Sequence, residues 1–197
     1  MRDRRSSAAS RRASKPTRRR ASGSGAGPRK VAPKAGPRAG RPTAARARAG
    51  EQVAARLCQA VLAGEGVARA EIGFVYGDDA ALRALNARFR QTDRATDVLS
   101  FTYEDGLDPR GERVLSGDVA VSVPRVVAQA KRFRVSLGRE LARLLTHGAL
   151  HLCGHDHVKV GERRIMRARE RRHLNALTAP EENALTDLVR AWSGEKS

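Results

Sequence analysis

Hydrophobic and polar positions after residue 50 follow two different periods along the chain. Recurrence of apolar residues every three or four positions, together with one very basic segment, predicts helices over 51–63, 80–90, 124–133, 137–153, 160–176 and a final stretch ending near Trp192. Short runs rich in β-branched and aromatic residues predict strands over 70–76, 97–103 and 118–123. The mixture predicts an α+β fold in which helices cover a small mixed β-sheet.

The chain divides near residue 50 into segments of very different composition. Residues 1–49 hold 16 Lys and Arg, one acid and no aromatic residue, which predicts a disordered basic tail. Three roles stay open for it: a solvated tail that binds polyanions, an organelle transit peptide, or a start site assigned too early. We expect one folded domain over 50–178 and a C-terminal helical extension over 179–197.

Four of the five histidines lie within residues 147–157, and three of them form the pattern H-x-x-x-H-x-x-G-x-x-H. His147 and His151 are four residues apart on a predicted helix, so they share one face. Gly154 allows a positive φ, which turns the chain back and brings His157 in as a third ligand. Three imidazoles with one open position are typical of a catalytic zinc site. The pattern therefore predicts one Zn²⁺ on a long central helix and the following loop, although imidazoles also bind other divalent metals.

The residue between the first two histidines separates this chain from the metalloproteases. They carry a glutamate at the position of Gly148, and that glutamate is their general base. The sequence keeps the metal ligands and lacks the base, which indicates a hydrolase that depends more on the metal, its water or the substrate. Among the neighbouring residues, Cys153 is interpreted as a packing residue, His155 as a polar loop residue, and Asp156 as a loop residue or an acceptor for a ligand imidazole.

The number of cysteines and the hydropathy of the chain restrict the cellular compartments in which the protein can function. Cys58 and Cys153 are too few for a disulfide framework, so we expect reduced thiols. No stretch is long and apolar enough to span a bilayer, so we expect a protein of a reducing compartment without a membrane partner.

Further motifs precede the histidine run in a fixed order. They are Leu85-Asn86 with Phe89-Arg90, then T-D-V-L-S-F at 96–101, then G-D-V at 117–119. Together with the histidines, they resemble the YbeY family of bacterial and organellar endoribonucleases over about residues 51 to 177.

The resemblance implies a cofactor and an activity. One zinc ion would be held by His147, His151 and His157, and Arg90 falls on an arginine that the family keeps in the same cavity. The implied activity is cleavage of single-stranded RNA in the maturation and quality control of small-subunit rRNA, with the ribosome as partner. His155 departs from the family, which commonly has tyrosine there.

Physical chemistry is compatible with these roles but leaves alternatives. A guanidinium at Arg90 is suited to hold and stabilise phosphate charge. Residues 159–172 contain seven basic residues against two acids, which favours contact with RNA phosphates over a purely solvated helix. The competing hypotheses are a ribosome-associated structural zinc module without catalysis and, less favoured because of Gly148, a metallopeptidase. The oligomeric state and the RNA nucleophile stay open.

Overall fold

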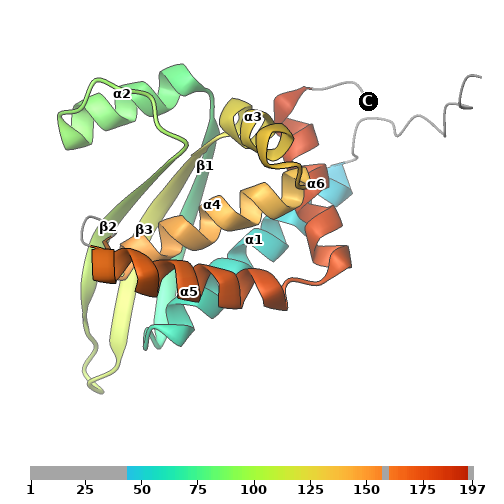
Figure 1. Ribbon diagram of the computed structural model, residues 1–197. Helices are drawn as coiled ribbons and strands as arrows, with labels where there is room; N and C mark the ends of the chain where they lie inside the picture. Colours follow the sequence, from blue (N-terminus) through green and yellow to red (C-terminus); the bar gives the residue numbers. More distant parts are fainter. Residues whose placement is uncertain (1–43, 157–159, 195–197) are drawn as a thin grey trace, which may run out of the picture. The chain divides into compact units, whose positions relative to one another are not determined.

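The computed structural model describes residues 44–156 and 160–194, with the side chain of Val160 excepted (Figure 1). The elements in chain order are α1 (Ala44–Gly64), β1 (Arg69–Gly77), α2 (Asp79–Arg90), β2 (Val98–Leu107), β3 (Arg113–Ser122), α3 (Val123–Phe133), α4 (Leu137–Leu152), α5 (Val160–Ala176) and α6 (Ala179–Ser193). This arrangement confirms the predicted α+β class. None of the described helices is long and apolar enough to cross a membrane.

The sheet has three strands in the order β1-β3-β2. The central strand β3 runs parallel to β1 and antiparallel to β2, so the sheet is mixed, as expected. Val119 on β3 faces Phe74 on β1 and Ser100 on β2, and the β2 register shifts between Thr102 and Glu104. The shift leaves one extra residue on β2, which is a β-bulge.

Helix α4 organises the core. It packs on α1, α6 and β2, and Figure 1 shows it running between α3 and α5. Its buried residues are Gly138, Glu140, Leu141, Ala142, Leu144, Leu145, Thr146, Gly148, Ala149, Leu150 and Leu152. Most of them are apolar, so burial against three elements fixes this helix more firmly than its own propensity does.

Helix boundaries follow local signals in the sequence. Asp78 caps α2 by accepting a hydrogen bond from the backbone of Ala81 at 2.8 Å. Ser136 caps α4 in the same way by accepting from the backbone of Arg139 at 2.9 Å. Each cap satisfies a backbone N–H that the first helical turn leaves unpaired.

Two parts of the chain differ from the sequence-based expectation. Both strands extend well beyond the predicted ranges 97–103 and 118–123, so β2 and β3 form a hairpin joined by residues 108–112. Salt bridges across the hairpin, such as Arg113 to Asp105 at 2.7 Å, stabilise polar residues in extended backbone. The period of apolar residues does not detect such a solvated hairpin.

The ends of the domain also differ. Helix α1 begins at Ala44, inside the segment expected to be a disordered tail, and residues 1–43 lie outside the described residues. At Gly50 an added Cβ would lie 2.5 Å from the carbonyl oxygen of Ala184, so α1 and α6 cross in close contact. Leu185, Leu188 and Val189 of α6 are buried in the main core. The segment after residue 178 therefore contributes to the packing of this domain.

Candidate active site

A polar cavity of about 690 Å³ opens where the C-terminal half of α4 meets α2 and β2. Its lining brings together two stretches that are far apart in the sequence, 86–100 and 147–156: Asn86, Arg90, Thr92, Arg94, Thr96, Asp97, Val98, Leu99, Ser100, His147, His151, Gly154, His155 and Asp156. The structure thus places Arg90, His147 and His151, three of the four predicted site residues, on one cavity. The fourth, His157, lies outside the described residues.

The two helical histidines point at a common position. Their Nε2 atoms are 3.1 Å apart, and their ring planes meet at 74° with centroids 4.6 Å apart. Two imidazole nitrogens bound to one tetrahedral zinc at about 2.0–2.1 Å would be separated by about 3.3 Å. The observed separation therefore fits a shared metal ion, as the four-residue spacing on α4 predicts.

The far nitrogen of His147 has a carboxylate partner that the sequence did not reveal. His147 Nδ1 lies 2.6 Å from Glu170 Oε1 on α5, and both side chains are largely buried. An N–H at Nδ1 that donates to this carboxylate leaves the Nε2 lone pair facing His151, which is the tautomer a metal requires. Because Glu170 is 23 residues away, no local motif could have identified it.

The donor set suits zinc, but the described residues supply only part of it. Among the described residues, no three His, Cys, Asp or Glu side chains gather as a metal site. The pair of imidazoles is nevertheless of the donor type that zinc prefers, and Glu170 sets the tautomer of His147. A third nitrogen at residue 157 therefore stays a prediction.

Gly148 has a packing role. A Cβ added there would lie 2.8 Å from Val119 Cγ1 and 3.0 Å from Ser100 Oγ. Ser100 Oγ also donates a hydrogen bond to the Gly148 carbonyl at 2.8 Å, so α4 lies directly on the sheet at this point. The face on which a metalloprotease carries its glutamate is therefore closed by β2 and β3.

Arg90 lines the same cavity from α2 and is held there by a backbone contact. Its Nη2 donates to the Ser100 carbonyl at 3.0 Å. The loop that follows α2 is fixed by buried Asn86, whose Nδ2 donates to the Arg94 carbonyl at 2.7 Å. Since one guanidinium nitrogen is enough for the contact to Ser100, the others retain donors for an anion in the cavity.

Asp97, just before β2, connects this strand to the helices α3 and α4. Its carboxylate accepts hydrogen bonds from the Val98 backbone at 3.0 Å and from Gln129 Nε2 at 3.0 Å, and Arg143 lies 3.8 Å away. Burial acts most strongly on its pKa and opposes the charge, but the bonds from Gln129 and the backbone, with the charge of Arg143, together lower the pKa. Asp97 is therefore a charged anchor between β2 and the helices α3 and α4.

The loop after α4 is fastened to two distant elements. His155 Nε2 lies 2.7 Å from Glu65 Oε2, and Arg169 on α5 pairs with the same carboxylate. Cys153 packs against the core, and burial raises its thiol pKa to about 11, so it stays protonated at neutral pH. His155 thus engages the carboxylate of Glu65, and Cys153 is a packing residue.

Taken together, the fold and this cavity define a small α+β protein with a histidine pair and an arginine facing one polar hollow. The family model described as endoribonuclease YbeY matches residues 42–178. The chain belongs to the YbeY family, and it is a hydrolytic endoribonuclease.

Individual relatives agree with this assignment. The chain is 45% identical over 123 residues to endoribonuclease YbeY of Moorella thermoacetica, covering 58% of this chain and 78% of that one. It is 42% identical over 125 residues to the protein of the same name from Pelotomaculum thermopropionicum, covering 62% and 82%. A solution structure of a Thermotoga maritima protein is similar at a TM-score of 0.46 and 20% identity, covering 75% of this chain and 85% of that one.

Proposed function

We propose that this protein is a single-strand-specific, zinc-dependent endoribonuclease that acts in the cytoplasm in small-subunit rRNA maturation and ribosome quality control. The observation that carries the proposal is the 3.1 Å convergence of His147 and His151 in a cavity that Arg90 also lines. The names of the relatives supply the RNA substrate class, and the cavity supplies groups suited to a phosphodiester.

The metal would be held by His147, His151 and His157. A bound zinc ion supplies a Lewis acid for a phosphoryl oxygen and lowers the pKa of bound water. The protein's own contribution is to fix the two helical imidazoles. Glu170 accepts a hydrogen bond from the Nδ1–H of His147. The close packing of Gly148 against β2 and β3 sets the distance between α4 and the sheet.

Arg90 would bind the phosphate that is cut. Cleavage concentrates negative charge on the non-bridging oxygens, and a guanidinium held in advance by the Ser100 carbonyl meets that charge without reorganising. A single donor of this kind contributes roughly 10²–10³ in rate when it acts on the transition state. The residue would therefore affect turnover more than fold or metal content.

A metallopeptidase is disfavoured by the same geometry. The position that would carry the general base is filled by strand side chains, as the 2.8 Å approach to Val119 shows. A structural zinc module without catalysis is the alternative that the experiment must distinguish from an enzyme.

The test compares Arg90→Ala with Arg88→Ala, because both residues lie in the last turn of α2. Cleavage of a single-stranded RNA and of its duplex form is measured for both variants and the wild type, with zinc content measured in parallel. We expect the wild type to cut only the single strand, Arg90→Ala to lose roughly 10²-fold or more in kcat with zinc retained, and Arg88→Ala to match the wild type. A wild type that holds zinc but cuts no RNA would instead support the structural module.

A further inference from the structure

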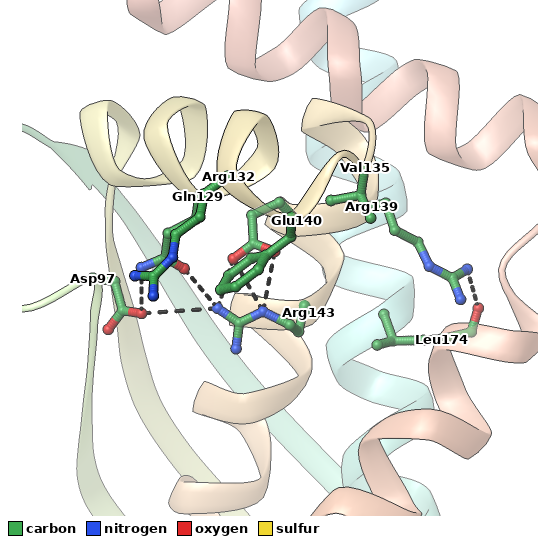
Figure 2. Close-up of a pocket in the computed structure, with 9 residues that line it drawn as sticks. Asp97, Gln129, Arg132, Val135, Arg139, Glu140, Arg143 and Leu174 are labelled. Carbon is green, nitrogen blue, oxygen red and sulfur yellow. Dashed lines mark hydrogen bonds and ion pairs between the residues drawn. The ribbon is translucent and has the colours of Figure 1, made fainter.

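A second cavity, of about 550 Å³, lies beside the first one and shares Asp97 with it (Figure 2). It is formed where α3, α4 and α5 meet, and its lining is Asp97, Gln129, Arg132, Phe133, Val135, Arg139, Glu140, Arg143 and Leu174. Neither the histidine motif nor the residues proposed for cleavage explain this hollow.

A stripe on α4 connects the two cavities. Arg139, Arg143, His147 and His151 follow one another at four-residue intervals, which places them along one face of the helix. At 1.5 Å per residue, the stripe spans about 18 Å, a length that a few nucleotides of extended RNA cover. Between the cavities, a smaller hollow of about 320 Å³ is lined by Arg143 and His147 of the stripe and by residues of α5. The hollows therefore follow one another from the histidines to Phe133.

The charges along this path favour a polyanion. Figure 2 shows Arg143 between Asp97 and Glu140. Glu140, which is 2% exposed, is paired with Arg143 at 2.6 Å, and Asp97 is held by Gln129 and Arg143. One guanidinium offsets only one of these two carboxylates and the amide of Gln129 is neutral, so the net positive charge of the two hollows comes from their other arginines.

Two arginines on the rim remain available to a ligand. Arg132 lines the second cavity and Arg167 lines the smaller hollow, and both are exposed. Within the described part of the chain, no carboxylate lies within ion-pair distance of either guanidinium. Each can neutralise one phosphate without first breaking an ion pair in the protein.

An aromatic ring is present at the end of the path. Phe133 is 52% exposed, and the guanidinium of Arg132 lies 5.5 Å from its ring centroid. Single-stranded nucleic acids commonly bind by stacking bases on exposed aromatic rings while cations follow the backbone. An exposed ring beside an unpaired arginine offers both contacts in one place.

We propose that the α3–α4–α5 cavity is a distal subsite for single-stranded RNA, where a base a few nucleotides away from the cut phosphate stacks on Phe133 and phosphates on the way contact Arg132 and Arg167. The inference rests on the proposed function and names the path by which its substrate is held. RNA is preferred over an acidic protein because the cavity is continuous with the histidine cavity and offers an aromatic ring. Stacking has little sequence preference, so the subsite extends affinity more than specificity.

The experiment measures cleavage kinetics on two single-stranded RNAs, a short one that fills only the histidine cavity and a longer one with added flanking nucleotides. Phe133→Ala is compared with Trp192→Ala, whose ring is similarly exposed (53%) but lines a different cavity. Arg132→Ala is compared with Lys131→Ala, which removes the same charge from the neighbouring exposed position on α3. Zinc content and thermal unfolding are recorded for every variant.

We expect Phe133→Ala to raise KM for the long RNA by at least roughly fivefold, with kcat and the KM of the short RNA unchanged. Arg132→Ala should reduce the slope of log affinity for the long RNA against log salt by about 0.7 more than Lys131→Ala does. Equal KM values for Phe133→Ala and Trp192→Ala on the long RNA would overturn the subsite, as would equal losses on both RNAs. Those outcomes leave the proposed function intact if the wild type cleaves, whereas a wild type that neither binds nor cuts RNA overturns both.

Discussion

The two sides of helix α4 show how differently packing and chemistry are specified. On one side Leu141, Leu144 and Leu145 are fully buried against neighbouring helices. On the other side His147 and Arg143 are partly exposed and are oriented by carboxylates from α5, the start of β2 and α4 itself. The packed side depends on the size and apolarity of its residues, whereas the polar side depends on particular atoms supplied by distant segments.

Mutations on the two sides of α4 should therefore have different consequences. Changes on the packed side should reduce stability and leave the chemistry of the surviving folded protein intact. Changes on the polar side should reduce metal or RNA binding with little effect on unfolding. The following predictions test that separation.

The largest expected effect is at Gly148, where the helix lies directly on the sheet. Gly148→Glu should destabilise the fold by at least about 3 kcal/mol, because it forces a charged side chain between Val119 and Ser100. Gly161→Glu is the control, since an added Cβ there meets no atom within 4 Å and the residue lies in the first turn of α5. Urea unfolding measures both, and a Gly148→Glu protein as stable as the wild type would contradict the close packing.

A smaller loss is expected in the leucine-rich layer. Leu145→Ala removes a side chain with no exposed surface and should cost about 2–5 kcal/mol of unfolding free energy. The protein that remains folded should bind zinc with the wild-type stoichiometry, since the imidazoles of His147 and His151 are not changed. Loss of zinc in that folded fraction would show that the two sides of α4 are coupled.

On the polar side, Glu170→Gln should weaken zinc binding by roughly 10–100-fold, because the amide no longer supplies a charged acceptor at His147 Nδ1. Competition with a chelator measures the affinity directly. Glu162→Gln is the control on the same helix, because Glu162 lines none of the cavities described above. Equal affinities for the two variants would remove Glu170 from its proposed positioning role.

The smallest expected effect is the contribution of Asp97 to the pH dependence of stability. The pKa of Asp97 is lowered in the folded protein, so its contribution to stability is present above the unfolded pKa of about 3.9 and is lost as the pH falls through the lower folded value. Asp97→Asn should therefore lose less stability than the wild type on acidification. The difference should persist in high salt, because Asp97 is partly buried.

Asp93 provides the contrast for that pH prediction. Its pKa is lowered by a hydrogen bond and the charge of Arg83, but the pair is exposed. Salt should therefore screen the Asp93 contribution. If high salt also removed the Asp97→Asn difference, the buried anchor at Asp97 would be refuted.

The sequence predicted elements and ligand candidates that depend on local spacing. Local patterns located part of every helix and strand but missed the solvated half of the β2–β3 hairpin, and the four-residue interval placed His147 and His151 on one face of α4. Sequence reasoning missed Glu170 and Glu65, because contacts across 23 and 90 residues leave no local pattern. It also interpreted Gly148 only as a missing base, since the approach of β3 to α4 appears only when the sheet is assembled.

The most direct test of the account is zinc analysis coupled to single-stranded RNA cleavage for the wild type, His151→Ala and His173→Ala, all purified identically. His173 lies on α5 away from the cavity, so it controls for the loss of a histidine. We predict about one zinc per chain and equal cleavage for the wild type and His173→Ala, with zinc and cleavage lost together in His151→Ala. Unchanged zinc content or undiminished cleavage in His151→Ala would contradict the proposed metal site.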